Sequence, residues 1–307
     1  MPAERTRQRK KKKKWPKIVG IICLLLLVAG GAYVYSVYNS LTNAVETMHT
    51  PVDREKSDIA FNKKEPFTVL MLGVDEREGD RGRSDTMIVL AVNPETNSVK
   101  MLSIPRDTRT EIVGHGTTDK INHAYAFGGV KMAMDTAENF LDIPIDYYMQ
   151  INMEGFKDIV DAVGGVTVNN DLDFTSEGVH FAKGQITLNG EEALNYSRMR
   201  KQDDRGDFGR QLRQRQIIQA VLKEGASVST LTNYDDIFKA LSTNVKTNLT
   251  FDEMVDIQQN YRSAAKKVDQ MTIESTGTKI NGVYYGIVSD EEKQRVQKEL
   301  KTQLKIK

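Results

Sequence analysis

The chain has 307 residues, of which 39% are hydrophobic, so it can bury one sizeable core and is not disordered throughout. Its formal net charge of +1 hides an uneven distribution: residues 1–17 carry nine Lys or Arg against one Glu, and the remaining residues carry 34 basic against 41 acidic side chains. The mildly acidic body argues against a nucleic-acid-binding protein.

The basic head leads directly into residues 18–38, which carry no charge. This run is as long as the roughly 20 residues that span a bilayer, so it predicts a transmembrane helix. The positive-inside rule places residues 1–17 in the cytoplasm and the body outside the cell. A cleaved signal peptide is the alternative, because AGGA at 29–32 resembles a cleavage site, although such peptides have shorter apolar cores. The only cysteine, Cys23, lies in this run, so the exported body is expected to lack disulfides and thiol chemistry.

Residues 39–65 are polar with weak periodicity, which is typical of a stalk or an amphipathic link to the folded body. The body begins near Pro66 with three apolar, partly β-branched runs that end in Gly, Asp, Asn or Pro. This pattern predicts strands buried on both faces, over residues 67–75, 85–93 and 98–107.

Helical spacing alternates with strand patterns further along the chain. We predict helices over 128–142 and 153–165 with a strand over 147–153 between them, and this alternation favours an α/β layered domain. A second group of predicted helices covers residues 188–200, 209–226, 249–264 and 290–304. Thr250 and Glu253 form a capping box at the start of the third of these. Residues 227–307 are therefore expected to form a helical part packed on the same domain.

The motifs exclude several common chemistries. The chain has no P-loop, and GHGTTD at 114–119 has Asp where a dinucleotide motif needs its third glycine. The four histidines lack zinc-ligand spacing, and no serine lies in a nucleophile elbow. Hydride transfer, zinc hydrolysis and triad hydrolysis are therefore not expected.

Charged residues gather instead at the predicted strand ends. Asp75 ends the first strand, Asp85 begins the second, and Arg106 with Asp107 ends the third. Ligands of open α/β sheets bind at the carboxyl ends of strands, where these side chains could meet the six arginines of residues 196–216. Paired carboxylates suit Mg²⁺ and surplus arginines suit phosphate, a combination typical of phosphoryl transfer.

Each of these residues also has a plainer interpretation. Asp75 could be a turn residue, Arg106 and Asp107 could be a local pair that holds a loop, and Lys120 could be a surface residue. The arginine-rich segment itself could be a solvated helix face.

Six spaced motifs agree with one family. Along residues 67–226 stand, in order, LMLGVDER, GRSDTMIVL, SIPRDT, KINHAYAFGG, VGGVTVNN and LNGEEALNYSRMRKQDDRGDFGRQLRQRQ. Together they closely resemble the LytR-CpsA-Psr family of cell-wall enzymes, and within it the teichoic acid transferases of Firmicutes. The resemblance implies an α-β-α catalytic domain over residues 66–226, with a central mixed sheet and a long apolar groove for a polyprenyl tail.

The resemblance also implies a reaction and its site. An anionic glycopolymer, in the first instance wall teichoic acid, would pass from an undecaprenyl-pyrophosphate carrier to a peptidoglycan hydroxyl outside the membrane. Asp75 and Asp85 would hold Mg²⁺ or Mn²⁺ against the pyrophosphate, and Asp207 would take the proton of the incoming hydroxyl. The pyrophosphate would be bound by Arg83, Arg106, Lys120, Arg198, Arg200, Arg210 and Gln214. Arg106 and Arg200 would act directly on the charge that develops as the bond breaks.

Four charged residues of the same segment are expected to lie outside the site. Arg213 and Arg215 are predicted to face solvent or the lipid headgroups. Asp203 and Asp204 are predicted only to limit the repulsion among the arginines.

Two other functions stay open at this point. A non-catalytic, membrane-anchored regulator of wall lysis or transcription would hold an anionic polymer on the same arginines, but gives no reason for Asp75 and Asp85. A pyrophosphatase acting on the carrier lipid would use the same residues with water as the acceptor. For the transferase, the expected partners are the carrier-linked polymer, peptidoglycan and membrane lipid.

Overall fold

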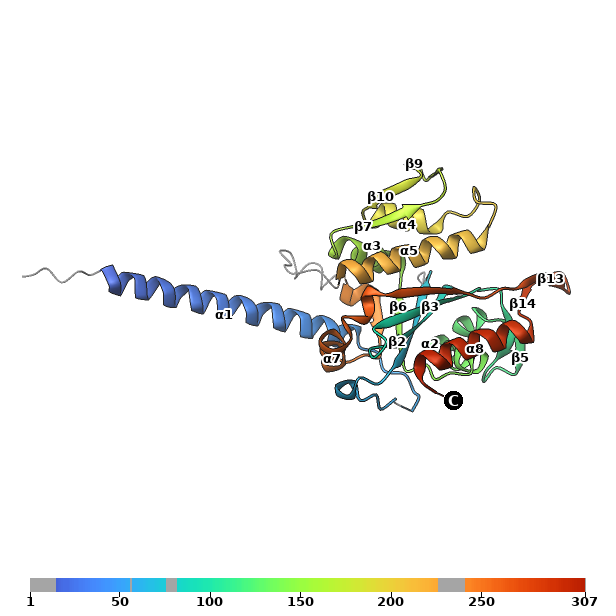
Figure 1. The fold of residues 1–307 in the computed structure, drawn as a ribbon, viewed down its shortest axis with the longest axis horizontal. Helices are drawn as coiled ribbons and strands as arrows, with labels where there is room; N and C mark the ends of the chain where they lie inside the picture. Colours follow the sequence, from blue (N-terminus) through green and yellow to red (C-terminus); the bar gives the residue numbers. More distant parts are fainter. Residues whose placement is uncertain (1–14, 56, 76–81, 226–240, 307) are drawn as a thin grey trace, which may run out of the picture.

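The computed structural model describes residues 15–55, 57–75, 82–225 and 241–306, with only the backbone described for residues 15–30 and 225. A long helix, α1 (Trp15–Met48), projects from a layered body (Figure 1). Its last turns pack on that body, because Ala44 and Val45 are buried and the ring of Tyr38 meets that of Phe251 edge-on at 5.4 Å. The first part of the predicted stalk, residues 39–48, is therefore helical and docked.

The predicted transmembrane run, residues 18–38, falls largely on residues whose side chains are not described. Among the described side chains, no helix is both long enough and apolar enough to cross a membrane. The predicted cytoplasmic head, residues 1–17, lies almost wholly outside the described residues.

A six-stranded sheet forms the centre of the body, in the order β11-β6-β1-β2-β3-β12. Its strands are β1 (Phe67–Val74), β2 (Ser84–Asn93), β3 (Ser98–Ile104), β6 (Tyr147–Ile151), β11 (Val245–Thr247) and β12 (Val268–Thr272). The sheet is mixed: β1 is antiparallel to β2 and parallel to β6, and β12 is parallel to β3. The three strands predicted from continuous apolar runs are confirmed, because β1, β2 and β3 are buried on both faces.

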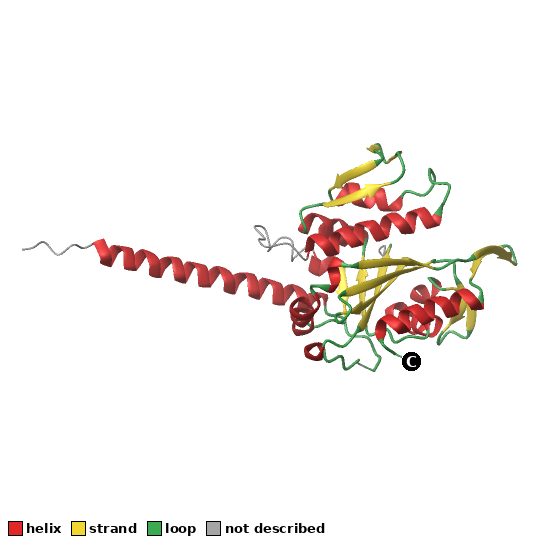
Figure 2. Ribbon diagram, in the orientation of Figure 1, coloured by secondary structure: helices red, strands yellow, loops and turns green. Residues whose placement is uncertain are grey.

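Helices cover both faces of this sheet, which confirms the layered α/β prediction (Figure 2). One face packs on α2 (His123–Leu141) and α8 (Asp290–Leu304), through residues such as Leu72 and Leu102. The other face packs on α7 (Phe251–Tyr261) and α5 (Asp207–Gly225), through Phe67 and Met101. The capping box predicted for α7 is present, with Thr250 and Glu253 bonded reciprocally.

A smaller unit stands beside the sheet, with its own apolar cluster that includes Phe174, Phe181 and Tyr196. It consists of α3 (Met153–Ala162), β7 (Val166–Asn170), β8 (Phe174–Ser176), β9 (Val179–Phe181), β10 (Gly184–Leu188) and α4 (Gly190–Arg198). The long helix α5 joins both units, because its Ile217 packs in this cluster while Ile218 packs against the sheet.

The prediction that residues 227–307 form a helical part packed on the same domain is incomplete: among the described residues, 241–306, it holds for α7 and α8 but omits several strands. These residues supply β11 and β12 to the central sheet, and the hairpin β13–β14 (Thr276–Ile280, Val283–Ile287) projects from its end. These strands are short and expose polar side chains, so their apolar pattern is weak; β12, for example, reads VDQMT. The remaining short elements are β4 (Arg109–Ile112), β5 (Thr117–Lys120) and two single-turn helices, Phe61–Lys63 and Ala264–Lys266.

Candidate active site

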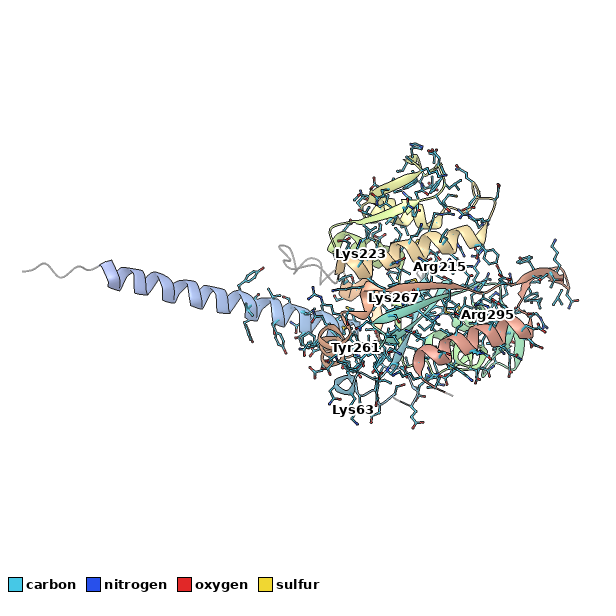
Figure 3. All side chains as sticks on the ribbon, in the orientation of Figure 1. Lys63, Arg215, Lys223, Tyr261, Lys267 and Arg295 are labelled. Atoms are coloured by element: carbon cyan, nitrogen blue, oxygen red, sulfur yellow. The ribbon has the colours of Figure 1, made fainter. Side chains whose placement is uncertain are left out.

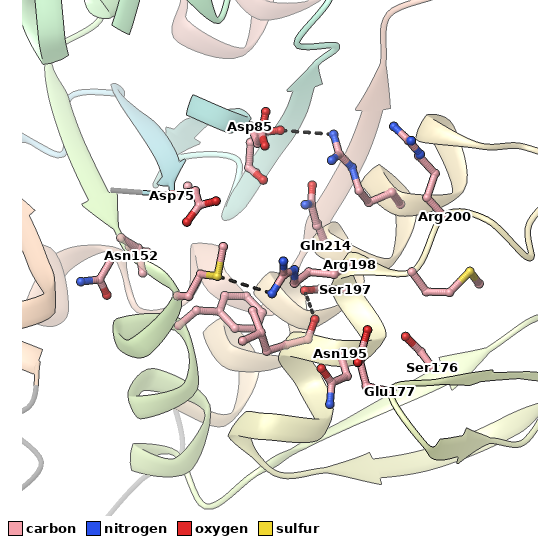
Figure 4. A pocket seen from close by; sticks show the side chains of 18 of the residues that line it. Asp75, Asp85, Asn152, Ser176, Glu177, Asn195, Ser197, Arg198, Arg200 and Gln214 are labelled. Atoms are coloured by element: carbon pink, nitrogen blue, oxygen red, sulfur yellow. Dashed lines mark hydrogen bonds between the residues drawn. The ribbon is translucent and has the colours of Figure 1, made fainter. Parts of the chain in front are cut away.

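A cavity of about 1170 Å³ opens between the ends of strands β1, β2 and β6 and the smaller unit (Figure 4). Residues from the sheet, α3, α4 and α5 line it together. Seven of the predicted site residues are in this lining, namely Asp75, Asp85, Arg106, Arg198, Arg200, Arg210 and Gln214. The structure thus brings together segments that are more than a hundred residues apart in the sequence.

The two predicted metal ligands approach the cavity from neighbouring strands. Asp75 follows β1, and Asp85 lies in β2 at an irregular position, because Gly73 pairs with Thr86 whereas Val74 pairs with Ser84. Asp85 is therefore the extra residue of a β-bulge, a device that redirects a side chain out of the regular ladder. Figure 4 shows both carboxylates on the cavity side of the sheet.

This donor set fits Mg²⁺. No group of three or more His, Cys, Asp or Glu within the described part of the chain is arranged to hold a metal. Mg²⁺ is commonly held by one or two carboxylates, with phosphate oxygens and waters as the other ligands, so two carboxylates beside a cavity lined by arginines are compatible with Mg²⁺.

Arg106 is paired with carboxylates at the sheet side of the cavity. Its Nη1 donates to Asp85 Oδ1 at 2.8 Å, and its Nε lies 3.8 Å from Asp107 Oδ2. Burial lowers the pKa of Arg106, but the hydrogen bond and charge of Asp85, with the charges of Asp207 and Asp107, outweigh burial and raise it. The Nε itself is buried without a hydrogen-bond partner in the described structure, so a donor is available at this position.

Arg210 lies deeper and in a more strongly positive environment. Its Nη2 is 2.8 Å from Asp207 Oδ1 and donates to the backbone carbonyl of Asp85 at 3.3 Å. Burial lowers the pKa of Arg210, and the charges of Arg106 and Arg200 lower it further, against the opposing effect of Asp207 and Asp85. Cations that destabilise one another in this way favour an anionic ligand between them.

Arg198 and Arg200 occupy the opposite wall. Helix α4 begins with a capping box of Asn189 and Glu192 and ends at Arg198, whose Nη1 lies 3.5 Å from Met153 Sδ. The Arg200 side chain makes no hydrogen bond or ion pair with the described residues. Gln214 lies one helical turn beyond Arg210 on α5, which places its amide on the same face.

Three predicted site residues do not line the large cavity. Asp207 lies in an adjoining hollow with Asp85, Arg106 and Arg210. Lys120 donates to Asp107 Oδ1 at 2.6 Å. Arg83 is exposed just before β2. Lys120 and Arg83 therefore belong to the surroundings of the site and not to its lining.

The prediction that Arg213 and Arg215 face solvent or headgroups is wrong. Both side chains are buried, with 0% and 4% of their surface exposed, and they lie on different sides of α5, Arg213 toward the smaller unit and Arg215 toward the sheet. Arg215 lies between α5 and the sheet (Figure 3), where it donates to Ser103 Oγ at 3.0 Å and Gln270 Oε1 at 3.1 Å, and burial lowers its pKa to about 10. Arg and Gln follow one another closely in this part of α5, so the sequence alone did not show which of these polar side chains are buried.

The simple role predicted for Asp203 is also incomplete. Asp203 is buried and accepts hydrogen bonds from Arg205 and Arg213, so it is a structural ion-pair partner. Its neighbour Asp204 is exposed, and the role predicted for Asp204 stays a prediction.

The cavity also has two linings that motif matching did not assign. Apolar side chains come from the ends of β1 and β6 and from α3, α4 and α5, namely Met71, Ile151, Met153, Phe156, Leu194 and Ile218. Polar side chains come mainly from the β8–β9 turn and α4, namely Thr175, Ser176, Glu177, Asn195 and Gln202. The apolar residues were readable in the sequence only as strand ends and helix faces, because nothing local marks which of them border a cavity.

Comparison with known proteins identifies the family. The model of the LytR_cpsA_psr family matches residues 34–302. The chain belongs to the LytR-CpsA-Psr family. Its relatives in this family include the polyisoprenyl-teichoic acid–peptidoglycan teichoic acid transferase TagU of Bacillus subtilis, which is 52% identical over 97% of this chain and 98% of its own length. The Bacillus anthracis protein of the same name is 53% identical over 94% of this chain and 97% of its own length.

Solved structures of LytR-CpsA-Psr proteins share the fold. The crystal structure of B. subtilis TagU is 52% identical and covers 80% of this chain and 99% of its own, with a TM-score of 0.65. A structure of TagT bound to LIIa-WTA is 33% identical and covers 83% of this chain and 96% of its own, with a TM-score of 0.69. The α/β architecture with a central mixed sheet is therefore that of the family.

Proposed function

We propose that this protein is a teichoic acid transferase, which moves the polymer from a polyisoprenyl-pyrophosphate carrier to a hydroxyl of peptidoglycan. The observation that carries the proposal is that Asp75 and Asp85 line one cavity together with the cationic side chains of Arg106, Arg198, Arg200 and Arg210. The names of relatives more than half identical over nearly the whole chain support the same activity.

The reaction proposed for the cavity is phosphoryl transfer. The acceptor oxygen forms a bond to the phosphorus that carries the saccharide, the bond from that phosphorus to the bridging oxygen breaks, and polyprenyl phosphate leaves. Negative charge builds up on the bridging and peripheral oxygens, and positioned guanidinium groups stabilise it. The buried, unpartnered Nε atoms of Arg106 and Arg210 are donors of this kind.

Asp75 and Asp85 are the residues that would hold Mg²⁺, or Mn²⁺ in its place. When bound, the ion neutralises pyrophosphate charge and helps to orient the scissile bond. The apolar residues of the cavity, among them Met71, Ile151 and Phe156, suit a polyprenyl chain.

The proton acceptor proposed from the sequence is Asp207. Its Oδ1 is paired with Arg210 at 2.8 Å and its Oδ2 accepts from Gln211 Nε2 at 2.9 Å. Because it borders the adjoining hollow and not the large cavity, this geometry supports a role in holding Arg210 more directly than a role in proton transfer.

We also propose that residues 18–38 anchor the chain in the cell membrane, with residues 1–17 in the cytoplasm and the body outside. The uncharged run behind a one-sided cluster of lysines supports this topology. An anchored enzyme would meet its lipid-linked donor at the membrane surface.

A transfer assay distinguishes the proposal from its two alternatives. The full chain in detergent is incubated with a lipid-pyrophosphate-linked saccharide, Mg²⁺ and peptidoglycan oligomers. A saccharide phosphodiester on the oligomer supports the transferase. Free saccharide phosphate without linkage indicates a pyrophosphatase, and an unchanged donor that still binds the protein indicates a regulator; either result would contradict the proposal.

A further inference from the structure

We infer that Arg213 is a positioning residue, which holds the backbone between Arg198 and Arg200 so that both guanidinium groups face the cavity. The inference rests on the proposed function only in what these two arginines bind. Arg213 does not itself line the cavity.

The contacts of Arg213 are directed at one peptide. Its Nη2 donates to the backbone carbonyl of Met199 at 2.6 Å, and the same nitrogen lies 3.9 Å from Met199 Sδ. That carbonyl belongs to the peptide between Met199 and Arg200, one residue after Arg198. A guanidinium presents several donors in a rigid planar fork, so the group fixes direction as well as distance.

Arg200 depends on this support because it has no side-chain partner of its own among the described residues. Helix α4 ends at Arg198, so Arg200 stands on the first residues beyond the last helical turn. The segment that follows is tied at only a few points, including Gln202, which exchanges hydrogen bonds with the backbone of Thr175 in β8. The Arg200 carbonyl accepts from the backbone N–H of Asp203 at 3.4 Å, and the bond from Arg213 adds a side-chain tie at the preceding carbonyl, that of Met199.

The Arg213 guanidinium is itself fixed on three sides. Nη1 donates to Asp203 Oδ2 at 2.7 Å, and the guanidinium carbon lies 5.5 Å from the centre of the Phe174 ring. Asp203 also accepts from the backbone and side chain of Arg205, whose other nitrogens grip Asp171 after β7. Hydrogen bonds therefore connect Asp171 of the smaller unit to Arg213 on α5 through Arg205 and Asp203.

The Asp203 carboxylate is closely packed against the backbone of α5. A methyl group added at Gly209, in the first turn of α5, would lie only 2.0 Å from Asp203 Oδ2. The carboxylate therefore rests against the helix backbone at a position that only glycine leaves open. A buried ion pair is weak evidence for stability, since desolvation offsets much of its attraction, so fold stability alone does not account for a fully buried guanidinium here.

A double-mutant cycle tests the inference. The quantity measured is the affinity of the full chain for inorganic pyrophosphate in the presence of Mg²⁺, by calorimetry. The four proteins are the wild type, Arg213→Lys, Arg200→Ala and the double variant. Lys keeps the charge but lacks the planar fork, so we expect Arg213→Lys to weaken binding about 10-fold in the wild-type background. In the Arg200→Ala background the same change should cost clearly less, about threefold, because one of the two groups that Arg213 positions is gone.

Arg205→Ala is the matched control. It removes the ion pairs to Asp203 and Asp171 but leaves the bond from Arg213 to the Met199 carbonyl, so it should lower the melting temperature and keep pyrophosphate affinity within about twofold. Equal losses for Arg213→Lys in both backgrounds, no loss in either, or an equal loss for Arg205→Ala would overturn the inference. If Arg213→Lys does not fold, Arg213→Met, which is apolar, of similar length and unable to donate to the Met199 carbonyl, replaces it in the cycle with the same expectations.

The binding readout separates this inference from the proposed function. If the cycle shows the expected coupling but no saccharide is transferred, the proposed function fails and the positioning role stands. If transfer occurs while the cycle is additive, only the positioning role fails. A wild-type chain that does not bind pyrophosphate would refute both.

Discussion

Arg106 offers the sharpest separation between a catalytic and a structural role. Its ion pair with Asp85 is partly exposed, since 45% of the Asp85 side chain is accessible, and such pairs contribute only about 0.2–1 kcal/mol to folding. Arg106→Ala should therefore lower the melting temperature by no more than about 4 °C. Removing one preorganised donor to a developing oxyanion slows the reaction about 10²-fold or more, which is about 2.7 kcal/mol on the barrier.

The assay is the initial rate of saccharide transfer at saturating donor, paired with a thermal melt of the same preparation. Arg106→Lys should recover only part of the rate, because an ammonium restores charge beside Asp85 without the planar fork. Arg106 and Arg200 are expected to act on one transition state, so the double Ala variant should lose less than the product of the single losses. Single variants within twofold of wild type, or losses that multiply cleanly, would refute the shared clamp.

Three further predictions follow from the same geometry. Asp85→Ala should abolish Mg²⁺-dependent transfer with an unchanged fold by circular dichroism, as EDTA should for the wild type; normal rates at low Mg²⁺ would remove Asp85 from the site. The hydrogen bond from Arg205 is the largest cause that lowers the pKa of both Asp203 and Asp171, so these carboxylates stabilise the fold above about pH 4 and lose that contribution as the pH falls through their lowered pKa values. Melting temperatures of Arg205→Ala should consequently fall less steeply than those of wild type between about pH 5 and pH 2, and parallel curves would contradict this assignment. Protease added to intact, wall-stripped cells should degrade the body and spare a small N-terminal fragment, whereas a soluble form lacking residues 1–32 would indicate a cleaved signal peptide.

Much of the central sheet was predictable because its strands are buried on both faces. Continuous apolar runs such as FTVLMLGV in β1 have few structural alternatives. Edge and hairpin strands such as β12 and β13 were missed, because they pair through the backbone and place polar side chains on exposed faces. Their existence depends on partners distant in sequence, such as β3 for β12.

The sequence predicted most of the residues that form the site, but not how they are arranged. Motif matching found Asp85, yet only the register of β1 and β2 reveals the bulge that turns it toward the cavity. The same motif placed Arg210 and Arg213 on one charged segment, and only the packing of α5 separates a cavity-lining arginine from a fully buried one. The charge of Arg213 can be buried because Asp203 pairs with it, and no local sequence pattern predicts that pairing.

In the proposed reaction a sugar hydroxyl, and not water, attacks the carrier pyrophosphate. Running the transfer reaction in water enriched in ¹⁸O and weighing the products by mass spectrometry tests this directly. For attack by the hydroxyl we expect saccharide phosphodiester on the peptidoglycan oligomer with no ¹⁸O, together with one polyprenyl monophosphate released per linkage. Saccharide phosphate that carries one ¹⁸O and accumulates as fast as the donor disappears would contradict it.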